Sequence, residues 1–240
     1  MTQEPSNATP AAKPASTHWK RLVAVWVALA ISTTVVAVVG WAALPLLSTN
    51  PTPTRPASPS LAAVEAIVWP RDFPPSRRWR FIVIHHSATP SATLDSIDRG
   101  HTDRGFTHGA GYHFLINNGI SEGTSDGQIT PTVRWLEQLD GAHTKAPGRP
   151  EYNAEGIGIC LIGHFEKRQP TAMQMAALQG LVAVLRTRYD ISLERIVGHR
   201  EVADTECPGR LFPMDDFLLE LRQSALKGSL ASPRRGAEGE

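Results

Sequence analysis

The chain has 240 residues, with 24 basic and 23 acidic side chains and a formal net charge of +1. This near-neutral balance points away from nucleic acid as a partner, and the length allows one or two domains. Because only two cysteines are present, Cys160 and Cys207, at most one disulfide can form. An exported protein would permit that bond. We do not expect the disulfide, because Cys160 lies inside an apolar strand pattern and Cys207 follows a candidate metal-binding histidine.

The N-terminal region has the pattern of a membrane anchor. Residues 1–21 are polar and predict a cytoplasmic tail, whereas residues 22–47 carry no charge. A helix over 22–43 would rise about 33 Å, enough to cross a hydrocarbon core of roughly 30 Å. Lys20 and Arg21 precede it, so we expect the rest of the chain on the extracytoplasmic (periplasmic) side of the cytoplasmic membrane. A cleaved signal peptide is the alternative, although the apolar run is long for one.

Residues 48–77 predict a linker between the membrane and a folded domain. Its first part contains four prolines among Ser and Thr, a composition that favours extended conformations. Its second part, from residue 61 onward, is ambiguous because it contains apolar residues and can also pack along the domain. We expect a single folded domain over 78–227, which is a common domain size, and a flexible tail over 228–240.

Strand and helix patterns alternate through the folded part. Apolar runs predict buried strands at 80–84, 111–116 and 156–162. The stretch 191–197 ends in an apolar pair and also predicts a strand, and 128–130 is a short candidate strand. Helical spacing is present at 93–101, from Pro170 onward and at 215–226. Thr171 and Gln174 have the spacing of a capping box at the start of the second helix. This order predicts an α/β fold in which helices cover a central sheet.

Histidines stand at the ends of two predicted strands, where α/β sheets place their sites. His85 and His86 end the first strand, His199 ends the last, and Cys207 follows on a loop. Imidazole and thiolate together suit a divalent cation, most often zinc. Since successive strand residues point to opposite faces, only one of His85 and His86 can share a pocket with His199. The spacing does not decide between them.

Three protein ligands would leave one tetrahedral position open, which is typical of a catalytic zinc site. Water in that position becomes a nucleophile near neutral pH, and the phenol of Tyr112 could stabilise an oxyanion. A core role for Tyr112 is an equal alternative. Glu201 could accept the second N–H of a ligating imidazole, or it is a solvated loop charge. A structural zinc module would need a fourth protein ligand, and none is obvious.

Five motifs follow one another between about residues 80 and 221. They are FIVIHHSAT at 81–89, GYHF at 111–114, GAH at 141–143, IGICLIG at 157–163, and GHRE through CPG at 198–209. Together they resemble the zinc-dependent N-acetylmuramoyl-L-alanine amidases. That family includes the phage amidase lysozymes and the animal peptidoglycan recognition proteins. The resemblance covers nearly all of the predicted domain.

The resemblance implies specific site residues. It places the first zinc ligand at His85 rather than His86, the second at His199, the third at Cys207, and the active-site tyrosine at Tyr112. It also implies a central mixed β-sheet flanked by helices, with zinc in a surface groove. The implied reaction is hydrolysis of the amide bond between N-acetylmuramic acid and L-alanine in peptidoglycan.

Further groove residues are expected from the same resemblance. His143 matches a groove histidine, with substrate contact or a structural hydrogen bond as its role, and His86 is also expected to bind substrate. Phage enzymes carry lysine two residues before the cysteine ligand, where this chain has Thr205. Threonine can donate a hydrogen bond to an oxyanion but offers no formal charge. Arg134 and Trp135 lie in a segment that departs from the family pattern, and they are candidates for substrate binding.

Two functions remain after these observations. The first is a membrane-tethered amidase that cuts peptidoglycan outside the cytoplasmic membrane. The second is a receptor of the same fold that binds peptidoglycan without cutting it. Non-catalytic members of the family typically lack the cysteine ligand, so the presence of Cys207 favours catalysis.

Overall fold

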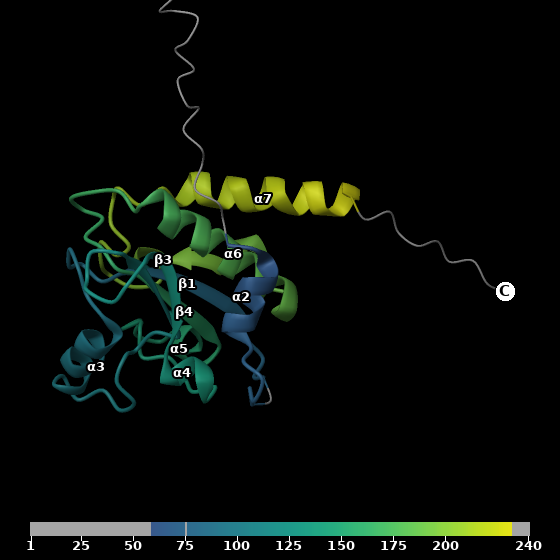
Figure 1. The fold of residues 1–240 in the computed structure, drawn as a ribbon. Coiled ribbons are helices and arrows are strands. Elements are labelled where there is room, and N and C mark those ends of the chain that lie inside the picture. Colours follow the sequence, from purple (N-terminus) through teal and green to yellow (C-terminus); the bar gives the residue numbers. More distant parts are fainter. Residues whose placement is uncertain (1–58, 75, 232–240) are drawn as a thin grey trace, which may run out of the picture. The chain divides into compact units, whose positions relative to one another are not determined.

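The computed structural model describes residues 59–74 and 76–231 (Figure 1). The predicted cytoplasmic tail, the predicted transmembrane segment 22–47 and the first part of the linker lie outside the described residues. Among the helices that are described, none combines the length and the apolar character needed to span a bilayer. The membrane anchor therefore stays a prediction.

A five-stranded mixed sheet forms the centre of the fold, in the order β3-β2-β4-β1-β5. Its strands are β1 (Phe81–His86), β2 (Phe114–Asn118), β3 (Asp126–Pro131), β4 (Gly156–Leu161) and β5 (Ile196–Gly198). β4 runs parallel to both β1 and β2, β5 runs parallel to β1, and β3 is antiparallel to β2. The predicted α/β class with a central mixed sheet is confirmed.

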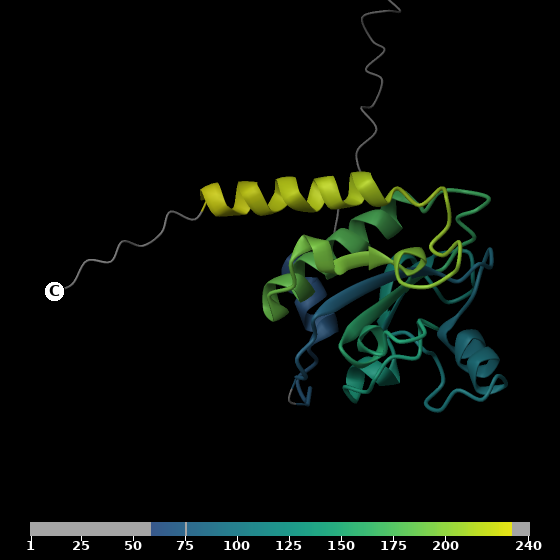
Figure 2. The same ribbon diagram turned by 180° about the vertical axis from the view of Figure 1, so that it is seen from behind.

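Helices flank the sheet on both faces. They are α2 (Leu61–Val68), α3 (Leu94–Thr102), α4 (Val133–Leu136), α5 (Glu151–Ala154), α6 (Ala172–Tyr189) and α7 (Met214–Ala231), with short 3₁₀ helices η1 (Leu193–Arg195) and η2 (His199–Glu201) around β5. α6 and α7 lie on one side of the sheet and α3 and α5 on the other (Figure 1; Figure 2). Thr171 and Gln174 form the capping box predicted at the start of α6.

The main core lies between the sheet and α6. Ile82 and Ile84 of β1 are fully buried there, together with Leu181 and Leu185 of α6. Because side chains alternate along a strand, the residues between them face the other side of the sheet. On that second face, Val83 belongs to a smaller apolar cluster, and His85 is 1% exposed.

α2 lies in the segment predicted as linker and belongs to the folded unit. Val64 and Val68 are fully buried in the main core. The backbone carbonyl of Val68 accepts a hydrogen bond of 2.6 Å from Trp135 Nε1. The domain therefore starts before residue 78, and the packing alternative for residues 61 onward is the one found. At the other end, α7 continues to Ala231, past the expected boundary at 227.

Candidate metal centre and its groove

Three side chains meet at the carboxyl ends of β1 and β5. One ring nitrogen each from His85 and His199 and the sulfur of Cys207 all lie within 4.8 Å of one another. The two imidazole rings are 4.6 Å apart between centroids, and Cys207 Sγ lies 3.7 Å from His85 Nδ1. The structure thus brings together His85, not His86, with the other two predicted ligands.

The loop from His199 to Cys207 is held by its own backbone. The N–H of Arg200 donates to the carbonyl of Cys207 at 2.7 Å, which closes the loop. The carboxylate of Glu201 accepts the N–H of Gly198 at 2.8 Å, so it supports the turn after β5. Thr205 Oγ1 accepts the N–H of Cys207 at 3.3 Å and does not line the groove. The expected catalytic role of Thr205 stays a prediction.

The donor set fits a zinc ion. His199 Nε2 is buried and has no hydrogen-bond partner, although buried polar atoms are normally paired. Burial holds the pKa of His85 well below its usual value, so its ring is neutral, which is the form that binds metals. Burial raises the pKa of the Cys207 thiol to about 12. A bound cation would displace that proton, because a coordinating thiol is deprotonated.

His86 lies on the opposite face of β1 from the ligands. Its Nδ1 accepts the N–H of Phe165 at 3.1 Å, and burial lowers its pKa to about 4. Its side chain is 8% exposed and does not line the groove, so the structure gives no support to the expected role in substrate binding, which stays a prediction. Its backbone N–H instead donates to Cys207 Sγ at 3.4 Å.

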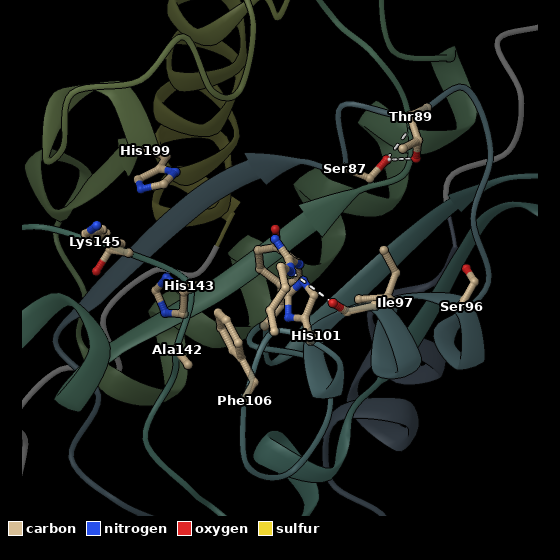
Figure 3. A pocket seen from close by; sticks show the side chains of 14 residues that line it. Ser87, Thr89, Ser96, Ile97, His101, Phe106, Ala142, His143, Lys145 and His199 are labelled. Atoms are coloured by element: carbon tan, nitrogen blue, oxygen red, sulfur yellow. Dashed lines mark hydrogen bonds between the residues drawn. The ribbon is translucent and has the colours of Figure 1, made fainter.

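A groove of about 500 Å³ opens beside His199 (Figure 3). It is lined by Ser87, Thr89, Ser96, Ile97, Gly100, His101, Arg104, Phe106, Tyr112, Ala142, His143, Thr144, Lys145 and His199. His143 and His199 lie next to each other on one side of it, and Ile97 and Ser96 of α3 lie on the other. The formally charged side chains of the lining, Arg104 and Lys145, are both cationic.

Tyr112 lies just before β2, with its ring 5.1 Å from the ring of His85. The hydroxyl of Thr132 donates to the Tyr112 carbonyl at 2.6 Å and anchors this part of the backbone. Burial, with a smaller contribution from the nearby cysteines, raises the pKa of the Tyr112 phenol well above its usual value. The phenol therefore keeps its proton at neutral pH. Tyr112 lines the groove, and its hydroxyl makes a hydrogen bond with the Cys160 side chain.

His143 lines the groove but is 7% exposed. Its Nδ1 lies 3.1 Å from Nε2 of His85, and its own Nε2 lies 3.1 Å from the carbonyl oxygen of Gly156. Burial lowers the pKa of His143 to about 3. The structural hydrogen bond that was one alternative for this residue is present, and the bond reaches a candidate metal ligand.

Arg134 and Trp135 both belong to α4, and neither lines the groove. Trp135 is fully buried in the main core. Arg134 is 5% exposed, and its guanidinium donates to the backbone carbonyls of Thr107, Ala110 and Asp140. Both side chains are enclosed by protein and outside the groove lining, so the structure gives no support to their expected role in substrate binding, which stays a prediction.

Among the titratable groove residues, the sequence interpretation missed three: His101, Arg104 and Lys145. His101 Nδ1 accepts the N–H of Gly111 at 2.9 Å, which leaves Nε2 to carry the proton of the neutral ring. Its place at the end of the amphipathic pattern 93–101 was the available signal. For Arg104 and Lys145, no sequence signal separates a groove cation from an ordinary surface charge.

Residues 75–210 match the family model described as N-acetylmuramoyl-L-alanine amidase. The chain is similar to peptidoglycan-recognition protein LB of Drosophila melanogaster, with 31% identity over 150 residues that cover 55% of this chain and 56% of that protein. It is also similar to the N-acetylmuramoyl-L-alanine amidase of Sus scrofa, with 26% identity over 141 residues that cover 54% of this chain and 21% of that enzyme.

A solved structure gives the same result. The endolysin amidase LysCS of Clostridium intestinale shares 34% sequence identity with this chain and aligns with a TM-score of 0.52, covering 60% of this chain and 84% of that one. The aligned part spans little more than half of the length of the fly protein. The family match itself covers more than half of the present chain. This chain therefore belongs to the N-acetylmuramoyl-L-alanine amidase family.

Proposed function

We propose that this protein is a zinc-dependent amidase that hydrolyses the amide bond between N-acetylmuramic acid and L-alanine in peptidoglycan. The observation that carries the proposal is the meeting of His85, His199 and Cys207 within 4.8 Å, beside a groove lined by Tyr112. Three protein ligands with one open position are typical of catalytic zinc. When bound, the ion would polarise the scissile carbonyl and activate water at neutral pH.

The chain's own residues supply the remaining parts of the reaction. Tyr112 keeps its proton and can donate a hydrogen bond to the carbonyl oxygen as negative charge develops on it. Thr205 stands close to the cysteine ligand and is the candidate for a second donor. Arg104 and Lys145 give the groove a positive potential, which suits a peptide stem that carries carboxylates.

The proposal includes a location outside the cytoplasmic membrane. A segment without charge at 22–47 and the proline-rich stretch after it would tether the domain within reach of the cell wall. Protease added to intact cells, with the outer membrane permeabilised where one is present, should digest the domain. If the domain resists until the cytoplasmic membrane is opened, the proposed topology is wrong.

A receptor that binds peptidoglycan without cutting it is the competing function, and the similarity to a peptidoglycan-recognition protein favours it. The presence of Cys207 favours catalysis, because a receptor does not need a complete set of zinc ligands. The purified full-length chain, loaded with zinc, should release L-alanine amino termini from purified peptidoglycan without new reducing sugar ends. Stable binding with no release would support the receptor instead.

A further inference from the structure

The ring of His143 is enclosed by glycines. A Cβ added at Gly141 or at Gly158 would lie 2.4 Å from Cδ2 of His143, far inside the contact distance. Any side chain at either position would therefore collide with the imidazole. Gly158 belongs to β4, whereas Gly141 lies two residues before His143 in the same loop, so the ring fits between β4 and its own backbone. This enclosure sets its orientation more strictly than a groove contact requires.

The hydrogen bonds of His143 determine where its proton lies. The Gly156 carbonyl, 3.1 Å from Nε2, can only accept, so Nε2 carries the proton. A protonated, cationic ring would be costly at this site, because it is buried against the rings of His85 and His113. A neutral imidazole has a single N–H, and Nδ1 of His143 is therefore an acceptor.

The proton position on His143 also determines the tautomer of His85. Its Nε2 lies 3.1 Å from the acceptor Nδ1 of His143, so Nε2 of His85 must be the donor. The lone pair of His85 then lies on Nδ1, the atom 3.7 Å from Cys207 Sγ. The chain of hydrogen bonds from Gly156 thus leaves His85 with its free nitrogen directed to the other candidate ligands.

We propose that His143 is a positioning residue for the metal, which holds His85 in the Nε2–H tautomer and fixes the direction of its lone pair. Metal-binding histidines commonly donate their second N–H to a carboxylate, a carbonyl or water. Here a neutral imidazole takes that place and relays the bond to a backbone carbonyl. The inference rests on the metal site of the proposed function, but it concerns zinc affinity and is tested without any hydrolysis.

The first test compares zinc dissociation constants of the full-length protein by competition with a chelator. His143→Leu removes both hydrogen bonds of the ring, and we expect zinc affinity to fall about 10–100-fold. His143→Asn keeps an acceptor near the position of Nδ1, and it should restore most of the affinity. If His143 only contacts substrate, both variants will bind zinc like the wild type, and the proposal is overturned.

His113 provides a matched control. It is fully buried, its Nδ1 accepts the N–H of Gly158 at 2.9 Å, and its Nε2 lies 3.1 Å from the carbonyl of Leu139. His113→Leu therefore also removes a buried imidazole with two hydrogen bonds, but no bond to a candidate ligand. We expect it to lower stability and to leave zinc affinity unchanged. An equal loss of affinity in His113→Leu and His143→Leu would reduce His143 to a purely structural residue.

A second readout uses the wild-type protein and does not depend on any variant folding. Nitrogen-15 NMR of the zinc-free protein should report His85 and His143 as neutral Nε2–H tautomers. A proton on Nδ1 of His85 would overturn the proposal. Absence of amide release, with zinc affinity and tautomers as expected, would instead contradict the proposed enzyme and leave this inference standing.

Discussion

Cys207 is the candidate ligand that can carry a negative charge, and burial keeps its thiol protonated unless a cation is present. Zinc binding and deprotonation are therefore coupled at this residue. We expect Cys207→Ala to lose zinc and, with it, amidase activity, as measured by metal analysis and by release of L-alanine amino termini. For zinc content, Cys160→Ala is the control, because Cys160 is also buried but is not in the ligand set. Full zinc content and activity in Cys207→Ala would contradict the site.

We expect Tyr112 to contribute to the rate of hydrolysis and not to zinc binding. Tyr112→Phe keeps the ring that packs 5.1 Å from His85 and removes only the hydroxyl. Loss of one preorganised donor to an oxyanion lowers kcat by roughly 10²–10³-fold in enzymes that use such donors. We expect a fall of that size with KM and zinc content nearly unchanged. Steady-state kinetics on a muropeptide, together with metal analysis, checks this, and an unaltered kcat would remove Tyr112 from the mechanism.

At the level of elements, the local patterns located the strands that carry the site. The continuous apolar run before His85 is β1. Of the strand predicted at 191–197 before His199, only the apolar end belongs to β5, because Leu193–Arg195 form η1. β1 and β5 are parallel neighbours, so their carboxyl ends lie side by side. Because side chains alternate along β1, only one of His85 and His86 can face the other two ligands. The choice itself needed either the family resemblance or the sheet, because a single strand does not reveal which of its faces lies under α6.

The sequence did not settle the burial of α2 or predict that of Arg134 and Trp135, because in each case the burial depends on contacts that are distant in sequence. α2 has only eight residues, and its buried pair Val64 and Val68 becomes meaningful only against the face of α6. Arg134 and Trp135 lie in a polar segment. However, the Arg134 guanidinium donates to a backbone carbonyl distant in sequence, and the Trp135 indole packs in the main core. Such burial depends on which surfaces meet, and local sequence carries little information about that.

The packing of α2 gives a stability prediction. Val68→Ala removes buried methyl groups from the main core, and it should lower the free energy of unfolding by about 2 kcal/mol. Leu61→Ala in the same helix is the control, because Leu61 is 55% exposed and should change stability by less than about 0.5 kcal/mol. Urea unfolding of both variants measures the difference. Equal effects would mean that α2 does not pack as part of the domain in solution.

Across the whole domain, burial of histidines links the site to stability. Burial is the main cause of lowered pKa values at His85, His86, His113 and His143. In the unfolded chain these rings return to about 6.5. Between that value and each folded value, the unfolded state binds more protons than the folded one. Stability therefore rises with pH across this range and is lost as pH falls.

We predict that the zinc-free protein loses unfolding free energy as pH drops below about 6.5, with a contribution from His86 that continues down to about pH 4. Each such group adds a slope of up to about 1.4 kcal/mol per pH unit. Urea unfolding in the presence of a chelator, repeated at several pH values, measures the total slope. His86→Asn keeps an acceptor for the Phe165 N–H but cannot titrate, so its slope between pH 6.5 and 4 should be shallower. An identical slope in this variant would show that His86 is not held neutral by the fold.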